Sequence, residues 1–380
     1  MLELLFLLLP LAFLSGWQTA KKRYKKAQSQ KRQLSDNLVK GINFLLDEQP
    51  DKALEVFLSH PEIDEYTAET YLLLGNMFRN RGEVDRALKV HQNLISRPAL
   101  AKEQKVAAML AYGEDFFAAG MLDRAEGVFQ ELIKNSSGDV QACGTLRSIY
   151  EQLQDWEKAI EVSRCEEKQS GNDHSRIIAH YYCELAEEEL EKGNIHLVEE
   201  YIENAQKSHK HSNRVLVLQG DLESRKNRPA NALKLYQKAI NNDSRLIGLL
   251  DKKLIAVTQQ LGNIDQLCNF LKKLLVRTND QKVLEYWVEL TLRYAQDKPL
   301  ENGLEDEVGK YASTKALLGI IKLWQLDQHD TKAGRHYELL SNVLERYLKN
   351  QTEFHCHHCG YKMNDFLWRC PACHHWDTVS

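Results

Sequence analysis

The sequence predicts an all-α solenoid of repeated helical hairpins, with a single transmembrane helix at the N-terminus and a small metal-binding module at the C-terminus. Three observations support this prediction. An apolar stretch opens the chain, small apolar residues recur at a nearly constant step through its middle, and two Cys-x-x-Cys pairs close it. The chain has 380 residues, of which 43% are hydrophobic and 27% charged, as is typical of a chain with a folded soluble body.

Residues 1–20 predict the transmembrane helix. The stretch from Leu2 to Trp17 is almost wholly apolar, and at 1.5 Å per residue a helix of about 20 residues crosses a bilayer core of about 30 Å. A cleaved signal peptide has its basic residues before the apolar run, whereas here they follow it, in the segment 21–34. By the positive-inside rule this basic segment stays in the cytoplasm, so we expect a single-pass protein whose body faces the cytoplasm.

The segment 35–348 predicts an array of helical hairpins. Its marker residues are separated by 34, 38, 34, 39, 34 and 35 positions, and they are Ala53, Ala87, Ala125, Ala159, Val198, Ala232 and Leu267. A step near 34 with small residues where two helices cross resembles the tetratricopeptide repeat, which implies about seven to nine stacked units. Past about Asn279 the pattern fades, although 283–294, 316–325 and 336–347 still have helical periodicity.

The frame within one unit is clearest around Gly75. An aromatic residue, Phe78, follows three positions later, and Ala87 follows twelve positions later, after a polar turn. The alanine must be small because the two helix backbones approach closely there. One such hairpin cannot bury its apolar stripe alone, so stacked units must share a continuous core.

The C-terminal segment 349–380 predicts a metal-binding module. Four thiolates can close a tetrahedral shell around one metal ion, and they come from Cys356, Cys359, Cys370 and Cys373. So short a stretch cannot build a core, and metal binding then supplies folding free energy on the order of 10 kcal/mol. The pairs resemble those of rubredoxin, which implies iron as readily as zinc. Gly360 fits the glycine that follows a rubredoxin Cys-x-x-Cys pair, whereas His374 occupies the place of the second glycine.

Two alternatives for these side chains stay open. Two disulfides would need an oxidising compartment, and the remaining cysteines show no paired spacing, as expected of free thiols in a reducing cytosol; they are Cys143, Cys165, Cys183 and Cys268. Five histidines crowd the two pairs and could bind metal themselves. Because four cysteines already complete the shell, we expect these histidines to face solvent or to surround the ligands; they are His355, His357, His358, His374 and His375.

We find no motif of an enzyme. The chain has no P-loop, no glycine-rich dinucleotide turn, no Gly-x-Ser-x-Gly and no His-Glu-x-x-His. The acidic run Glu187-Glu188-Glu189 is interpreted as solvated helix surface, and Trp156, Trp287 and Trp324 as packing residues. The net charge is −4, and the basic residues gather in segment 21–34 rather than along the array, which argues against nucleic acid as a partner.

The order of these parts resembles the lipopolysaccharide assembly protein B family of Gram-negative bacteria. The resemblance rests on the opening Met1-Leu-Glu-Leu-Leu-Phe-Leu-Leu-Leu-Pro10, on the segment from Gly75 to Ala87 and on the two closing cysteine pairs. It implies a non-enzymatic adaptor of the inner membrane that helps the membrane protease FtsH degrade the lipid A deacetylase LpxC. It also implies a scaffold for other lipopolysaccharide-synthesis proteins. These partners follow from the resemblance alone.

Two other functional classes compete with an adaptor. A membrane-tethered electron carrier of the rubredoxin type would require a reversible one-electron couple at the four thiolates. A nucleic-acid-binding zinc ribbon would require basic residues between the two pairs, where only Lys362 and Arg369 occur.

Overall fold

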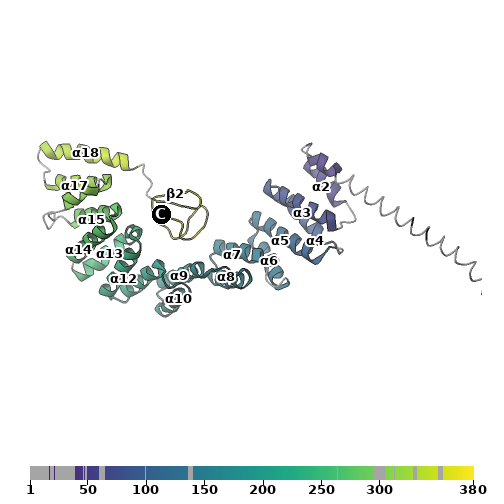
Figure 1. Ribbon diagram of the computed structural model, residues 1–380, viewed down its shortest axis with the longest axis horizontal. Helices are drawn as coiled ribbons and strands as arrows, with labels where there is room; N and C mark the ends of the chain where they lie inside the picture. The colour runs from purple at the N-terminus through teal and green to yellow at the C-terminus, as the bar shows by residue number, and fades with distance from the viewer. Residues whose placement is uncertain are drawn as a thin grey trace, which may run out of the picture. The chain divides into compact units, whose positions relative to one another are not determined.

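The computed structural model describes residues 39–380 apart from 46, 48, 60–64, 99, 136–139, 263, 295–303, 312, 328–331 and 350–353, together with Trp17 and Lys21. The predicted anchor 1–20 and basic segment 21–34 therefore lie outside the described residues, those two positions excepted. Among the helices that are described, none combines the length and the apolar character needed to cross a bilayer. The chain forms two compact units, Met1–Asn172 and Asp173–Ser380 (Figure 1).

Unit 1 consists of helices. After a helical segment at 39–45, antiparallel hairpins follow one another, and each packs on the next. The helices are α2 (Pro50–Leu58), α3 (Glu65–Asn80), α4 (Val84–Ile95), α5 (Lys102–Ala118), α6 (Leu122–Asn135), α7 (Val140–Leu153) and α8 (Trp156–Ser170).

Unit 2 continues the hairpins and ends in the cysteine module. Its helices are α9 (Ser175–Lys192), α10 (Ile195–Ser208), α11 (Asn213–Arg225), α12 (Pro229–Asn242), the short 3-10 helix η1 (Ser244–Leu246), α13 (Ile247–Leu261), α14 (Ile264–Thr278), α15 (Gln281–Tyr294), α16 (Leu304–Tyr311), α17 (Thr314–Asp327) and α18 (Lys332–Leu348). The module adds two short antiparallel strands, β1 (Phe354–His355) and β2 (Lys362–Met363). The helical segments predicted beyond Asn279 correspond to α15, α17 and α18, whereas α16 was not predicted.

The marker residues of the predicted repeat are fully buried. Each of the seven has no exposed surface, and they lie in turn on α2, α4, α6, α8, α10, α12 and α14, the second helix of each hairpin. The periodicity therefore identified the positions where helices cross, and the array is a mostly helical solenoid of the tetratricopeptide-repeat kind.

The close approach within a hairpin depends on a glycine facing an aromatic ring sixteen residues later. A Cβ atom added to Gly113 on α5 would lie 2.7 Å from the ring of Phe129 on α6, closer than packed carbon atoms tolerate. The same arrangement recurs in three other hairpins, in the pairs Gly41 with Phe57, Gly75 with His91 and Gly220 with Tyr236. The ring of the second helix thus fills the space that the missing side chain leaves.

His91 takes the place of the aromatic residue in its hairpin and brings polar atoms into the core. Its Nδ1 lies 2.5 Å from Oδ2 of Asp115, and both side chains are fully buried. Arg79 donates from Nη1 to Oδ1 of the same carboxylate at 2.8 Å. Buried polar groups are tolerated when they are hydrogen-bonded to one another. The hydrogen bonds among Arg79, His91 and Asp115 therefore connect helices α3, α4 and α5.

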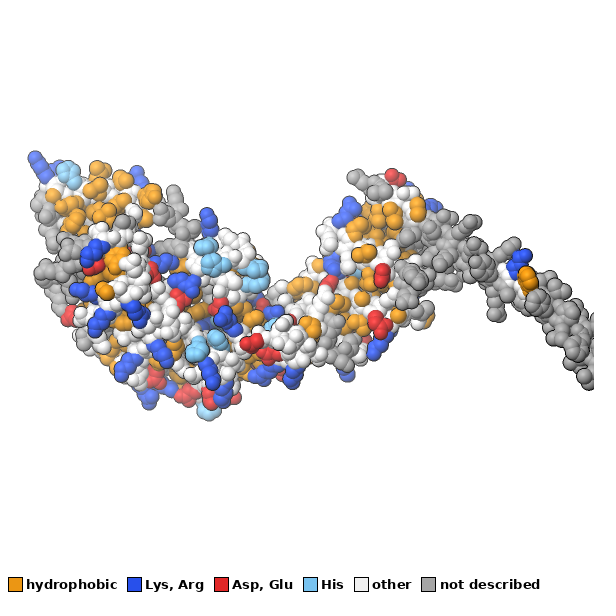
Figure 2. Space-filling model, viewed as in Figure 1, with side chains coloured by type: hydrophobic (Ala, Val, Ile, Leu, Met, Phe, Trp, Pro, Cys, Tyr) orange, Lys and Arg blue, Asp and Glu red, His pale blue; other side chains and the backbone are white. Residues whose placement is uncertain are grey.

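The last helix of the array exposes an apolar stripe. Leu339, Leu340, Val343 and Tyr347 of α18 are each about half or more exposed, and Figure 2 shows apolar side chains gathered over this helix. Residues three, four and eight positions apart lie on one face of a helix. In unit 2 this face of α18 therefore points to solvent rather than into the core.

We expect Gly113→Ala to destabilise unit 1 by about 1–3 kcal/mol, because the added methyl group must displace the ring of Phe129. Gly127→Ala in the same hairpin is the matched control. Gly127 is exposed on α6, and a Cβ there meets nothing within 4 Å. Alanine has the higher helix propensity, so the control should gain up to about 1 kcal/mol. Urea unfolding and hydrogen exchange of α5 and α6 measure both effects, and equal midpoints for the two variants would contradict the close-approach interpretation.

Candidate metal centre

The structure brings the four predicted cysteine sulfurs together at the centre of the module. The Sγ atoms of Cys356 and Cys373 are 3.6 Å apart, and those of Cys359 and Cys370 are 3.7 Å apart. All four lie within 4.8 Å of one another. A tetrahedral ion with metal–sulfur bonds of about 2.3 Å holds its sulfurs about 3.8 Å apart. The cluster therefore fits one tetrahedral ion such as zinc or iron.

Two matching turns aim backbone amides at these sulfurs. Gly360 follows the first cysteine pair with a φ of 74°, and His374 follows the second pair with a φ of 59°. In the first turn the amide of Tyr361 donates to the sulfur of Cys359, and in the second the amide of His375 donates to that of Cys373. His374 stands where a second glycine would be expected from the sequence, and it adopts the left-handed conformation that such a glycine would.

Hydrogen bonds favour the thiolate form of Cys356. Burial alone would raise its pKa, but the hydroxyl of Thr378 and the backbone amides of Cys359 and His358 outweigh burial and lower the pKa of Cys356 to about 5. The Oγ1 atom of Thr378 lies 3.2 Å from the sulfur. Because the thiolate is the form that binds metal, these hydrogen bonds keep Cys356 in its metal-binding form.

The module docks on α9 through an aromatic stack and an ion pair. The ring of Trp376 stacks on that of His180, with centroids 4.8 Å apart and planes inclined by 19°. The Nε2 atom of His180 donates to Oδ2 of Asp377 at 2.9 Å. Burial raises the pKa of Asp377, but the hydrogen bond from His180 and the positive charges of His180, Arg176 and His209 together outweigh it and hold the pKa of this carboxyl below its usual value. The side chain of His180 is only 4% exposed, so the contact is sealed from solvent on the α9 side.

Arg214 of α11 forms the second docking contact. Its guanidinium carbon lies 5.6 Å from the centroid of the Trp376 ring, within range of a cation–π interaction. It is held in place by Glu184 of α9 at 2.8 Å and by Glu187 at 3.0 Å. Burial raises the pKa of Glu187, although Arg214 acts in the opposite direction. The side chain of Glu187 is still 44% exposed, so the acidic run lies at the surface as expected, and one of its members also pairs with a buried arginine.

Further contacts extend the docking surface along unit 2. Arg245 of η1 donates from Nη1 to the carbonyl of Val379 at 3.3 Å, and the ammonium of Lys282 on α15 lies 3.7 Å from the ring centroid of Phe354. Phe354, Met363 and Val379 are buried in the same apolar cluster as residues of α12 to α17. The module thus packs against the first helices of successive hairpins and shares their core (Figure 1).

The structure also places the histidines, the remaining cysteines and the tryptophans that the sequence analysis named. The five histidines around the cysteine pairs are exposed, as predicted. None of the eight cysteines forms a disulfide, although the sulfurs of Cys143 and Cys165 are 3.7 Å apart. Trp156 and Trp287 are buried packing residues, and Trp324 is partly buried against the core of unit 2.

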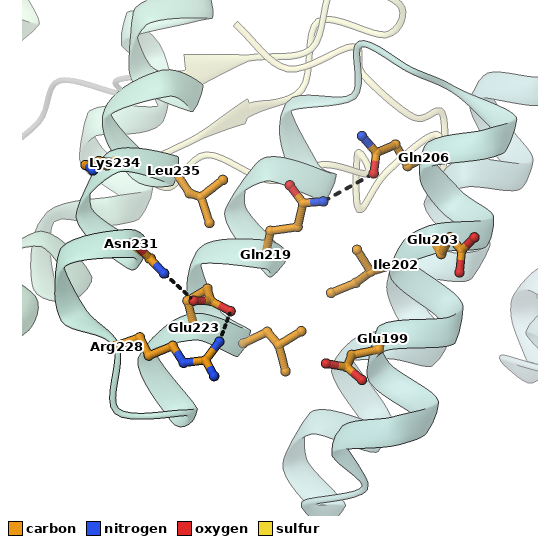
Figure 3. Close-up of a pocket in the computed structure, with 11 residues that line it drawn as sticks. Glu199, Ile202, Glu203, Gln206, Gln219, Glu223, Arg228, Asn231, Lys234 and Leu235 are labelled. Carbon is orange, nitrogen blue, oxygen red and sulfur yellow. Dashed lines mark hydrogen bonds and ion pairs between the residues drawn. The ribbon is translucent and has the colours of Figure 1, made fainter.

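A groove on unit 2 offers a second candidate surface. It lies between α10 and α12, has a volume of about 640 Å³ and is open to solvent. Its polar side chains bond to one another (Figure 3): Glu223 accepts from Asn231 at 2.9 Å, and Gln219 donates to Gln206 at 3.3 Å. Such mutually paired groups on a shallow surface suit contact with a protein rather than acid–base chemistry.

Sequence reasoning found the four cysteines but missed the docking residues. His180 and Asp377 are 197 positions apart in the chain, so no local spacing connects them. The available signal was Trp376 followed by Asp377 at the end of a module too small to bury a tryptophan by itself.

Comparisons with known proteins agree with both parts of the fold. A family model described as a rubredoxin metal binding domain matches residues 354–380, and one described as a tetratricopeptide repeat matches residues 70–105. Lipopolysaccharide assembly protein B of Escherichia coli (strain K12) is 30% identical over 381 residues, which cover 100% of this chain and 98% of that protein. The protein of the same name from Haemophilus influenzae is 29% identical over 394 residues, again covering 100% of this chain and 98% of that protein. Among solved structures, the crystal structure of MamA protein is 17% identical and has a TM-score of 0.33, covering 47% of this chain and 93% of that chain.

Cys356→Ser should abolish metal binding and leave residues 354–380 sensitive to protease, because the tetrathiolate supplies the folding free energy of the module. The helices of unit 1 should keep their structure, since repeat units depend mainly on their neighbours. Metal content per chain and limited proteolysis measure these outcomes. Cys165→Ser, which removes a thiol outside the cluster, is the control and should retain the metal; full metal content in Cys356→Ser would refute the ligand assignment.

Asp377→Asn should weaken docking of the module by about 1–2 kcal/mol at neutral pH, in the range of a partly buried hydrogen bond to a charged group. Asparagine tolerates the left-handed φ of 55° at this position, so the variant removes the negative charge without changing the backbone conformation. Because the pKa of Asp377 is lowered in the folded state, its contribution is complete above its ordinary pKa of about 4 and is lost as the pH falls through the lower folded value. The difference between wild type and variant should therefore shrink as the pH falls below about pH 4. Hydrogen exchange of α9 amides measures it, with Asp365→Asn on the exposed side of the module as the control.

Proposed function

The chain belongs to the lipopolysaccharide assembly protein B family, and on that premise we propose that it is a non-enzymatic adaptor that regulates lipopolysaccharide synthesis at the inner membrane. The observation that carries this proposal is the extent of the similarity, which covers 100% of this chain and 98% of the relative from Escherichia coli, with the array and the module both included. An adaptor needs binding surfaces and a location; in this proposal the array and the module provide the surfaces, and the apolar segment 1–20 provides the location.

In this proposal the array and the docked module bind clients as one surface. The hairpins of unit 2 and residues 354–380 share a core, so a partner that contacts the first helices of these hairpins also meets the module. A metal ion at the four thiolates supplies folding free energy, and because four thiolates leave no open coordination position, its role here is structural. We propose that the partners are the protease FtsH and the deacetylase LpxC, with the adaptor bringing the second to the first, and that other lipopolysaccharide-synthesis proteins gather on the same array.

The second candidate function is electron transfer. The amides of Tyr361 and His375 donate to cysteine sulfurs, and such hydrogen bonds tune the potential of iron in a tetrathiolate site. This function requires a reversible one-electron couple, whereas the adaptor function works equally well with redox-inactive zinc. The choice of metal therefore separates the two candidates.

Deletion of the proposed anchor, residues 1–20, tests the adaptor proposal. Residues 1–20 would hold the cytoplasmic body beside its membrane partner, and tethering raises the effective concentration of a weakly held partner to the millimolar range for short linkers. Deleting residues 1–20 should leave a folded protein that binds LpxC in solution but fails to shorten the lifetime of LpxC in cells. Pulse-chase measurement of LpxC turnover reports this outcome.

The matched control replaces residues 1–20 with an unrelated single-span helix of the same orientation. If tethering is the whole contribution of the anchor, this variant restores LpxC turnover. A soluble truncation with normal turnover would refute the tethering mechanism, and loss of LpxC binding from the intact chain in membranes would refute the adaptor proposal itself.

A further inference from the structure

A second group of possible metal ligands lies beside the tetrathiolate. His358, Cys373 and His375 each offer one ligand atom, and these three atoms lie within 4.8 Å of one another. The two imidazole rings stack with centroids 3.7 Å apart and planes inclined by 20°. The group therefore joins the first cysteine pair to the second across the surface of the module.

The hydrogen bonding of His375 leaves it able to bind metal. Its Nδ1 lies 2.9 Å from the backbone carbonyl of Cys373. Because a carbonyl oxygen can only accept, Nδ1 carries the hydrogen, and in the neutral ring Nε2 then keeps a lone pair. A histidine whose other nitrogen donates to a backbone carbonyl is the usual form of a metal-binding histidine in proteins.

The exposure of the group differs from that of the tetrathiolate. In the tetrathiolate, Cys356 and Cys370 are buried, Cys373 is half-buried and Cys359 is exposed, whereas both histidines of the second group are exposed. Figure 2 shows histidine side chains at the surface over the region of the module. Cys373 belongs to both groups, so an ion held by the two histidines already shares a ligand with the tetrathiolate.

We propose that His358, His375 and Cys373 form an entry site through which a divalent zinc-like ion passes to and from the tetrathiolate. Three ligands leave a coordination position for water, so ions exchange there faster than at four thiolates. Imidazole and thiolate are both ligands that zinc accepts. The ligand atoms of such an ion lie about 3.5 Å apart, a distance that rotation of the exposed side chains can reach.

Passage to the tetrathiolate is a ligand exchange without redox change. Cys373 remains bound while the thiolates of Cys356, Cys359 and Cys370 replace the two imidazoles and the water. Each cysteine that is still a thiol releases its proton to solvent when its sulfur binds the ion. Release of the ion follows the same steps in reverse, so the histidines accelerate exchange in both directions.

The test is isotope exchange in the full chain already loaded with zinc. Free zinc enriched in a heavy isotope is added, and native mass spectrometry follows its appearance in the protein. The variant His358→Gln with His375→Gln should exchange roughly tenfold more slowly than wild type, comparable to the effect of removing groups around other metal sites. Its equilibrium zinc content should stay at one ion per chain.

The matched control is His355→Gln with His357→Gln. These two rings are also exposed and flank Cys356, with centroids 5.1 Å apart, but within the part of the chain that the structure describes they belong to no group of possible metal ligands. Exchange in the control should equal that of wild type. If the stacked histidines only brace the two cysteine pairs, their removal will accelerate exchange instead, and that result overturns the proposal. Unchanged exchange in the His358 and His375 variant, or equal slowing in the control, overturns it as well.

Discussion

The close approach of two helices within each hairpin is the constraint on which the array depends. A glycine on the first helix and a ring sixteen residues later on the second define the contact in four hairpins, and the buried marker residues lie on the same second helices. Small side chains at these crossings let each hairpin present one continuous apolar face to the next. The helical scaffold that receives the metal module follows from this regularity.

Docking of the module adds a different kind of interaction. Trp376 contacts His180 of α9 and Arg214 of α11, and the carboxylates of Glu184 and Glu187 hold Arg214. Burying an arginine costs free energy unless its charge is paired. The two carboxylates provide that pairing and hold the guanidinium of Arg214 against the module. The geometry of the four thiolates and the fit of the interface are thereby coupled, because the segment that carries Cys373 also carries Trp376 and Asp377.

The sequence was informative where structure is local and periodic. Ala53, Ala87 and their equivalents could be placed at helix crossings because the repeat step fixes their environment, and the four cysteines could be grouped because their spacing is that of a metal site. The contact between His180 and Asp377 could not be predicted, since it joins segments 197 positions apart. Helix α16 was missed because its 8 residues are too few to show a helical periodicity. The left-handed turn at His374 could not be predicted either, because residues other than glycine adopt that conformation uncommonly and the surrounding fold decides where they do.

The shared core of unit 2 has a consequence for the biogenesis of the protein. Phe354, Met363 and Val379 complete an apolar cluster to which α12 to α17 contribute, yet these residues leave the ribosome after the helices that they cover. Until they arrive and a metal ion shapes them, the corresponding surface of the helices stays open to water, and exposed apolar surface is what chaperones and proteases recognise. A chain that lacks residues 354–380 therefore leaves the apolar surface that these residues cover in unit 2 exposed to water.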